Sequence, residues 1–219
     1  MNWSDLLFAM ALTIVFGAVT YANVSEVRSA QLARMIGLPY IAGSARVEPP
    51  PGFVGFCVRE SWSCGGRVGH VRKSRKDLKV LAERINTSVN QLISPEADIA
   101  QYGVQEYWTI PTSGRGDCED YALLKMRMLL ERGVPGKRLL LAVVITRFGE
   151  RHLVLVVRTP EADLVLDNIE PKLLDWRETT YRFVSIQDPA NLSRWISVKP
   201  AGAPPVNGRG KAELVSAVR

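Results

Sequence analysis

The sequence predicts an α+β domain, because a helix-rich first half is followed by a run of short strands. Apolar residues recur at three- and four-residue steps over residues 74–93, and a second helical pattern covers residues 117–132. After residue 138 the pattern changes to short runs rich in Val, Leu and Ile, which are typical of strands. The 219 residues, 47% of them hydrophobic and 23% charged, suit one ordinary globular domain.

The first element in the chain is an apolar stretch close to the amino terminus. Residues 6–19 read LLFAMALTIVFGAV, which is short for a membrane-spanning helix and typical of a signal peptide. Small residues follow, and Ala22 is a plausible cleavage point. The first five residues contain no Lys or Arg, whereas an export signal is normally positive, so an uncleaved anchor and a buried helix stay open. We expect residues 1–22 to be a signal peptide or N-terminal anchor of a periplasmic protein.

A proline- and glycine-rich region follows. Residues 23–50 are expected to form a partly helical lead-in, and residues 49–66, PPPGFVGFCVRESWSCGG, are expected to form a loop. A disulfide between Cys57 and Cys64 would agree with export, because disulfides persist in oxidising compartments. Two unpaired thiols are one alternative. A zinc site with His70 is another, although the spacing matches no standard ligand pattern.

The remaining elements follow in order. The helix over 74–93 has Leu78, Leu81, Ile85, Val89 and Leu92 on its apolar side, and residues 94–116 are expected to be mixed loop. In the second helix, Asp117 is a natural N-cap and Gly133 ends the helix. Strands are expected at 139–146, 152–158 and 163–167, with others at 183–186 and 195–198. Residues 23–199 would then form one domain, and 200–219 a flexible tail.

The charge of the chain does not point to a nucleic-acid partner. Lys and Arg total 28 against 22 acidic residues, giving a net charge of +6. The only cluster is Arg72, Lys73, Arg75 and Lys76, and no aromatic-rich RNA-binding motif or zinc-finger spacing accompanies it. A solvated basic face explains the excess of Lys and Arg over acidic residues.

Cys118 is the candidate nucleophile. With Cys57 and Cys64 paired it is the odd cysteine of a secreted chain, which makes it a candidate reactive thiol. It follows an apparent N-cap, and the first turn of a helix favours a thiolate. Of the two histidines, His152 opens a strand, and a hairpin that pairs Arg158 with Asp163 would bring it diagonally close to Asp167. That is the pairing of a base with an orienting carboxylate that nucleophilic catalysis needs, although a buried structural histidine would show the same spacing.

The sequence also carries a recognisable set of motifs. Trp108 with Pro111, the block GRGDCEDYALLK from Gly114, His152 heading a strand, and DLVLDN from Asp163 resemble the bacterial transglutaminase-like cysteine peptidases. This family includes a periplasmic protease that releases adhesins. The resemblance covers residues 50–198 and implies a papain-like, transglutaminase-like α+β fold. One departure is that residues 111–113 lack a Glu that family sequences usually carry.

The resemblance also implies the site residues. It assigns Cys118 as nucleophile, His152 as base and Asp167 as orienting carboxylate. It further implies a calcium ion bound by acidic residues around the nucleophile, and the matching positions are Asp117, Glu119, Asp120 and Asn168.

A cation is expected on electrostatic grounds as well. One carboxylate about 6 Å from a thiolate, at an effective dielectric near 20, opposes it by roughly 2.8 kcal/mol. The helix dipole contributes only about 0.3–1 kcal/mol in the favourable direction. Carboxylates and an amide carbonyl are hard oxygen ligands that suit Ca²⁺. The alternative is that Asp117 caps the helix while Glu119 and Asp120 merely complement its dipole.

We therefore expect an exported, calcium-dependent cysteine endopeptidase. Its substrate would be a periplasmic or surface protein, such as an adhesin, and an inner-membrane regulatory receptor is an expected partner. Acyl transfer of the transglutaminase or amidase type is an alternative, since the same triad serves both reactions. A partner-binding module without turnover is a second alternative, against which a complete Cys–His–Asp set argues.

Overall fold

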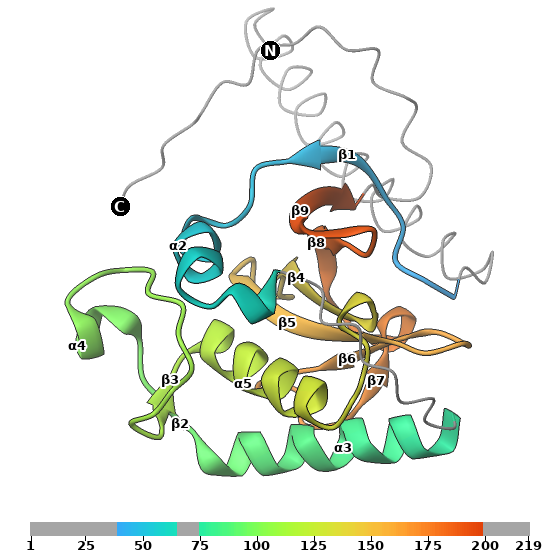
Figure 1. Ribbon diagram of the computed structural model, residues 1–219, viewed down its shortest axis with the longest axis horizontal. Helices are drawn as coiled ribbons and strands as arrows, with labels where there is room; N and C mark the ends of the chain where they lie inside the picture. The colour runs from blue at the N-terminus through green and yellow to red at the C-terminus, as the bar shows by residue number, and fades with distance from the viewer. Residues whose placement is uncertain (1–38, 65–74, 199–219) are drawn as a thin grey trace, which may run out of the picture. The chain divides into compact units, whose positions relative to one another are not determined.

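The computed structural model describes residues 39–64 and 75–198 (Figure 1). The predicted signal peptide or anchor, the tail, His70 and the start of the basic cluster lie outside these residues. Within them the predicted α+β class is confirmed, with helices packed on an antiparallel sheet. In this described part of the chain, no helix is both long and apolar enough to span a bilayer.

The sheet has seven strands in the order β1-β9-β8-β4-β5-β6-β7, and each neighbouring pair is antiparallel. All five predicted strands are present, although three of them begin earlier than predicted. The strands are β1 (Gly43–Val47), β4 (Leu139–Ile145), β5 (Arg151–Arg158), β6 (Asp163–Leu166), β7 (Leu174–Asp175), β8 (Arg182–Asp188) and β9 (Asn191–Val198). The lead-in was not expected to contain a strand, yet β1 adds an edge to the sheet by pairing with β9.

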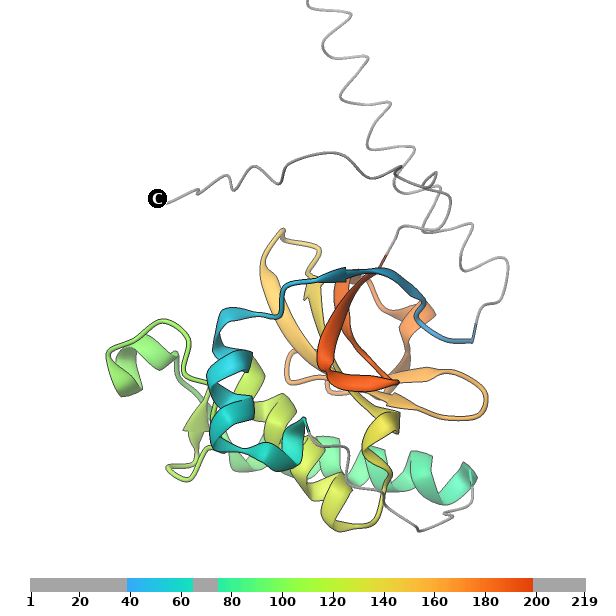
Figure 2. The same ribbon diagram turned by 45° about the horizontal axis from the view of Figure 1, so that its top comes forward.

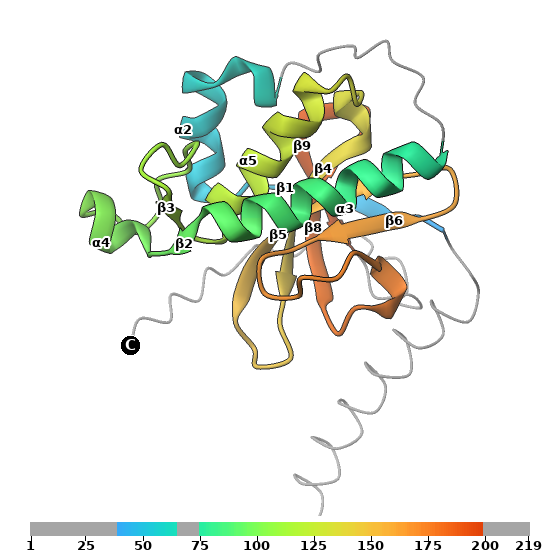
Figure 3. The same cartoon turned by 90° about the horizontal axis from the view of Figure 1, so that it is seen from below.

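Both predicted amphipathic helices are confirmed as α3 (Arg75–Leu92) and α5 (Cys118–Glu131). They lie side by side on one face of the sheet (Figures 1 and 3). The chain leaves α5 at Gly133, where φ is +82°, a left-handed conformation that glycine adopts without strain.

The prediction of a loop at residues 49–66 was wrong for its first half, which forms helix α2 (Pro51–Arg59). Pro51 occupies the first turn, where its missing N–H costs nothing and its fixed φ favours a helix. Phe53 and Phe56, three residues apart, are 1% and 0% exposed in the core. The short 3-10 helix η1 (Ser61–Ser63) follows, and the predicted Cys57–Cys64 disulfide ties it to the end of α2.

Residues 94–116 are also more ordered than the predicted mixed loop. They contain β2 (Ser94–Pro95), α4 (Asp98–Tyr102) and β3 (Arg115–Gly116). β2 and β3 are parallel, with Ser94 opposite Arg115 and Pro95 opposite Gly116. This pairing brings the start of α4 next to the start of α5, which positions the acidic site described below.

The central strands are buried on both faces, so the core has two parts. In β4, Leu139, Leu141 and Val143 pack with the helices, while Leu140, Ala142 and Val144 pack into a second cluster on the opposite face. The second cluster is enclosed because the sheet curves around it (Figure 2). Two short 3-10 helices, η2 (Gly136–Arg138) and η3 (Trp176–Glu178), complete the fold.

Candidate active site

The free cysteine lies at the first residue of α5. Cys118 is half-buried, and the structure leaves it outside the disulfide. The backbone N–H of Leu153 acts on the sulfur in the direction that lowers the pKa of Cys118. Since Leu153 follows His152 in β5, the thiol lies beside the strand that carries the predicted base.

The β5–β6 hairpin has the predicted register. Arg158 faces Asp163, and their side chains form an ion pair with 2.8 Å between Nη2 and Oδ2. Two residues are therefore brought together at the other end of the hairpin: Nε2 of His152 lies 2.7 Å from Oδ1 of Asp167. Because Asp167 occupies Nε2, the Nδ1 atom of the imidazole remains for the thiol. Both side chains are buried, at 6% and 2% exposure.

A cluster of three carboxylates lies next to the start of α5. One carboxylate oxygen from each of Asp98, Asp117 and Asp120 lies within 4.8 Å of the other two. Backbone N–H groups bind one oxygen of each: Tyr107 donates to Asp98, Thr109 to Asp120 (3.2 Å), and Asp98 to Asp117 (3.3 Å). The remaining oxygens, Asp98 Oδ1, Asp117 Oδ1 and Asp120 Oδ2, are buried and have no hydrogen-bond partner.

Glu119 belongs to a second group, with Asp117 and Cys118. The Cys118 thiol donates a hydrogen bond to Glu119 Oε2 over 3.2 Å. The predicted ligands therefore do not form one set: Asp120 lies with Asp98, whereas Glu119 contacts the sulfur. Asn168 is half-buried directly after Asp167, beyond the end of β6.

The comparison with family models decides the family. The model of the bacterial transglutaminase-like cysteine proteinases (BTLCP) matches residues 43–203, which include every site residue named above. The chain belongs to this family. Its fold is accordingly the predicted transglutaminase-like α+β arrangement, with the cysteine at a helix N-terminus and the histidine and aspartate on the antiparallel sheet.

Solved structures of LapG from Legionella pneumophila are similar to this chain. The calcium-bound form of LapG is 28% identical, with a TM-score of 0.47 over 63% of this chain and 74% of that one. A second LapG structure is 31% identical, with a TM-score of 0.44 over 51% and 64% of the two chains. An EGTA-treated form is 30% identical, with a TM-score of 0.44 over 53% and 65%. A search of the curated proteins gives no match.

The acidic cluster of this BTLCP member is electrostatically costly. Burial, more than offsetting the hydrogen bond from Thr109 and aided by the charges of Asp117 and Asp98, raises the pKa of Asp120 to about 7. Burial likewise raises the pKa of Asp98, and the charges of Asp117 and Glu106 add to the effect. Three clustered carboxylates, each with one buried oxygen that has no hydrogen-bond partner, fit a bound cation. Oxygens within 4.8 Å of one another are close to the spacing of ligands around one calcium ion, whose Ca²⁺–oxygen distances are about 2.3–2.6 Å.

The surroundings of the Cys118 thiol in this proteinase oppose its ionisation. Burial raises the pKa of Cys118 well above its ordinary value, and the Glu119 carboxylate raises it further by charge and hydrogen bond. Burial, together with the neighbouring Asp117, also raises the pKa of Glu119. The structure therefore agrees with the sequence-based expectation that neighbouring acids oppose the thiolate. Glu119 is the acid with the largest effect on the pKa of Cys118.

The capping interpretation of Asp117 fails in the structure. Asp117 does occupy the N-cap position of α5, but its side chain makes no capping hydrogen bond. Its carboxylate instead accepts from the Asp98 backbone and faces the cluster. Gly116 leaves the space that this arrangement needs, because a Cβ atom there would lie 2.6 Å from Asp120 Oδ2.

Two residues of the site were missed by sequence reasoning. Asp98 lies 19 positions before Asp117, and no local pattern marks it, since only the β2–β3 pairing brings it near. Tyr181 donates its hydroxyl hydrogen to Asp167 Oδ2 from the segment before β8, without any motif. The backbone N–H groups of Ile169 and Glu170 also donate to Asp167. Although burial alone would raise it, the bond from His152 and these other donors hold the pKa of Asp167 below its ordinary value.

One buried lysine, Lys125, lies on the same helix as Cys118. Lys125 is 1% exposed, and its Nζ is 5.7 Å from the centre of the Tyr121 ring. Burial lowers the pKa of Lys125 to about 7, while the negative charge of Asp167 acts in the opposite direction. Lys125 is therefore close enough to Asp167 to help balance its buried charge.

Proposed function

We propose that this chain is a calcium-dependent cysteine endopeptidase in which Cys118 is the nucleophile, His152 the base and Asp167 the orienting carboxylate. One observation carries the proposal. His152 is fixed through Nε2 by Asp167 at 2.7 Å, and it lies in β5, the strand that packs against the helix beginning with Cys118, the free cysteine. This is the order of nucleophile, base and orienting group that thiol peptidases require.

The roles follow from which atoms remain available. Nδ1 of His152 accepts the thiol proton, and the Cys118 sulfur attacks the carbonyl carbon of the scissile peptide. His152 then returns the proton to the departing amine, which leaves an acyl thioester on Cys118. Water, deprotonated by the same imidazole, hydrolyses the thioester and restores the thiol. Asp167 keeps the ring oriented and stabilises its positive charge while the proton is on it.

We propose Ca²⁺ as the cation of the acidic cluster, because all available donors are hard carboxylate oxygens. Asp98, Asp117 and Asp120 would hold it with the three oxygens that lack a partner, and Glu119 and Asn168 remain predicted ligands. When bound, the ion supplies positive charge next to Cys118, which offsets the acids that oppose the thiolate.

We further propose that the protein works in the periplasm on a protein substrate of the periplasm or cell surface, such as an adhesin. The Cys57–Cys64 disulfide supports an oxidising compartment. An inner-membrane regulatory receptor remains the proposed partner.

The test is cleavage of secreted and surface proteins from the source cell by the purified protein. With calcium present, mass spectrometry should find new protein amino termini, and adding EGTA should abolish them. Cys118→Ala and His152→Ala should remove them too, whereas His70→Ala, which changes the other histidine, should leave them. An added primary amine would separate the two reaction types, because acyl transfer joins the amine to the substrate whereas hydrolysis does not.

Iodoacetamide provides a readout that needs no substrate. Cys118 should be the cysteine modified in unreduced protein, with loss of cleavage. Labelling of Cys57 or Cys64 without prior reduction would contradict the disulfide. Equal loss of cleavage in His152→Ala and His70→Ala would contradict the assignment of the base.

A further inference from the structure

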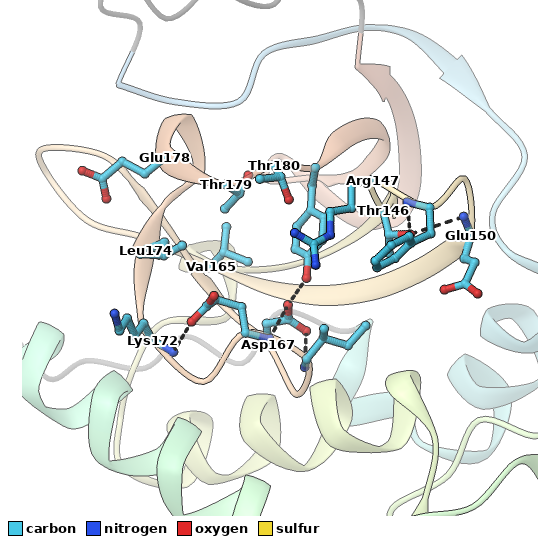
Figure 4. Close-up of a pocket in the computed structure, with 14 residues that line it drawn as sticks. Thr146, Arg147, Glu150, Val165, Asp167, Lys172, Leu174, Glu178, Thr179 and Thr180 are labelled. Atoms are coloured by element: carbon cyan, nitrogen blue, oxygen red, sulfur yellow. Dashed lines mark hydrogen bonds between the residues drawn. The ribbon is translucent and has the colours of Figure 1, made fainter.

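A pocket of about 440 Å³ lies beside the proposed catalytic pair (Figure 4). One wall is the turn between β4 and β5, residues 146–150, and the other is the segment 167–181 that follows β6. The volume is within the usual range of ligand sites, about 300–1,000 Å³. All of its lining residues come from the half of the chain that follows α5.

Two residues connect the pocket to the catalytic pair. Asp167 and Tyr181 both line it, and the Tyr181 hydroxyl donates to Asp167. The rings of Tyr181 and His152 are 5.9 Å apart between their centres. Cys118 is not among the lining residues. The pocket therefore lies on the Asp167 side of the imidazole, whereas the thiol belongs to the Nδ1 side.

This placement determines which part of a peptide can reach the pocket. The acyl half of the substrate is held on the Cys118 sulfur, while the departing amine takes its proton from His152. The chain that continues from this amine extends beyond the imidazole, away from the sulfur. We propose that the pocket binds the peptide segment on the carboxyl-terminal side of the scissile bond, a role that depends on the peptidase function proposed above.

The lining favours an apolar side chain within this segment. Val165, Leu174 and the ring of Tyr181 provide apolar surface inside the pocket. Phe148 and Ile169 also line it and are 73% and 58% exposed, which is high for large apolar side chains. A bound peptide would cover both and remove their apolar surface from water.

Charged side chains on the lining make the pocket selective for the charge of the bound peptide segment. The lining contains two cations, Arg147 and Lys172, and three glutamates, Glu150, Glu170 and Glu178, and the buried Asp167 adds a fourth carboxylate. Carboxylates thus outnumber cations, so an acidic residue directly after the scissile bond is disfavoured by repulsion. The pocket is suited to an uncharged peptide segment with an apolar side chain.

The experiment uses a peptide library made by digesting a bacterial protein extract with trypsin, incubated with the full-length protein and calcium. Cleavage sites are read by mass spectrometry as residue preferences on either side of the cut. Thr180→Trp places a large ring at an exposed lining position, and Ser193→Trp places the same ring at an exposed position outside the pocket. Thr180→Trp should lower kcat/KM about tenfold or more for peptides with a large apolar residue after the cut.

Preferences before the cut should stay as in the wild type, and Ser193→Trp should change neither side. Identical preferences in Thr180→Trp and wild type, or changes confined to positions before the cut, would overturn the assignment of the pocket. Cleavage of no peptide by the wild type would overturn the peptidase function itself. If Thr180→Trp fails to fold, Glu150→Lys is the second variant. It should increase cleavage before acidic residues, because it replaces a carboxylate of the lining by a cation. Unchanged cleavage before acidic residues would overturn the assignment of the pocket.

Discussion

The backbone N–H of Asp98 donates to Oδ2 of Asp117 over 3.3 Å, although Asp117 is the N-cap residue of the helix that begins with Cys118. A side chain in this position ordinarily satisfies the N–H groups of its own helix. Here it gives up that bond and joins two other buried carboxylates, an arrangement that is favourable only with a compensating positive charge.

The first prediction concerns the ligand that the sequence did not indicate. Asp98→Asn should lower calcium affinity about tenfold or more, because it removes one of three charged ligands while keeping the side-chain shape. Isothermal titration calorimetry measures the effect. Glu131→Gln is the matched control, since Glu131 is an exposed acid paired with Arg127 on α5 and lies outside the cluster. Equal affinity in Asp98→Asn and wild type would place the ion elsewhere.

The second prediction is a pH dependence of stability in calcium-free protein. The pKa of Asp120 is raised from 3.8 to about 7 in the folded state, so the folded protein binds more protons than the unfolded chain between these values. The stability that Asp120 contributes is therefore complete below about pH 4 and is lost as the pH rises through about 7. Urea unfolding should show lower stability at pH 8 than at pH 5, by up to about 3 kcal/mol, because part of the contribution is already lost at pH 5.

Two comparisons isolate the cause of this loss. Saturating calcium should restore stability at pH 8, because the ion neutralises the carboxylates. Asp120→Asn should reduce the pH dependence of the calcium-free protein, since it removes the titrating group. A calcium-free wild type that is equally stable at both pH values would contradict the electrostatic account of the cluster.

The third prediction links the ion to the thiol. Burial and Glu119 raise the pKa of Cys118, so positive charge bound at the adjacent cluster should lower it. The rate of alkylation by iodoacetamide should rise about tenfold at pH 7.5 when calcium is present. The curve of rate against pH should shift to higher pH in chelator, on protein shown by circular dichroism to be folded in both conditions. Superimposable curves would mean that the ion is purely structural.

Glu119→Gln provides an independent form of the same test. The substitution removes the charge nearest the sulfur and keeps the side-chain length, so alkylation should shift to lower pH even in chelator. Asp117→Asn should combine weaker calcium binding with a smaller shift of the same direction, because Asp117 belongs to both acidic groups.

The fourth prediction concerns Tyr181, whose hydroxyl donates to Asp167. Tyr181→Phe should lower kcat about tenfold or more with little change in KM, because a hydrogen bond to a charged group is worth about 1.5–3 kcal/mol. Without this donor the pKa of Asp167 should rise, so the acid limb of the kcat profile should move to higher pH. Tyr40→Phe is the matched control, since it removes a hydroxyl that donates to the Pro160 carbonyl. A Tyr181→Phe profile that coincides with wild type would exclude a positioning role.

The accuracy of the sequence analysis depended on how local each signal was. The β5–β6 register could be predicted because one short turn and the Arg158–Asp163 pair determine it, and the proximity of His152 and Asp167 follows from that register. The helices α3 and α5 each carry a complete apolar pattern and a clear end. α2 was missed because glycine and proline in residues 49–66 suggested a loop, whereas Pro51 begins a helix stabilised by the burial of two phenylalanines.

The separation of the predicted ligands into two groups has a different origin. Neighbours in sequence, such as Glu119 and Asp120, point to different sides of a helix, so Glu119 contacts the Cys118 sulfur while Asp120 lies with Asp98. The position of Asp98 depends on a two-residue parallel pairing between β2 and β3, which no periodicity can show. Tyr181 contacts Asp167 from the segment before β8, and this contact depends on the arrangement of the strands in the sheet.

A cation held by Asp98 and Asp117 would also act as a reversible cross-link. It would join positions 19 residues apart in the chain, and closing a loop of about 15 residues permanently is worth about 3 kcal/mol on the chain-entropy estimate. The Cys57–Cys64 bond closes a shorter loop and lasts as long as the compartment is oxidising. The ionic link would instead follow the concentration of free calcium around the protein. The order of the chain leading into the helix of Cys118 would then depend on the composition of the medium.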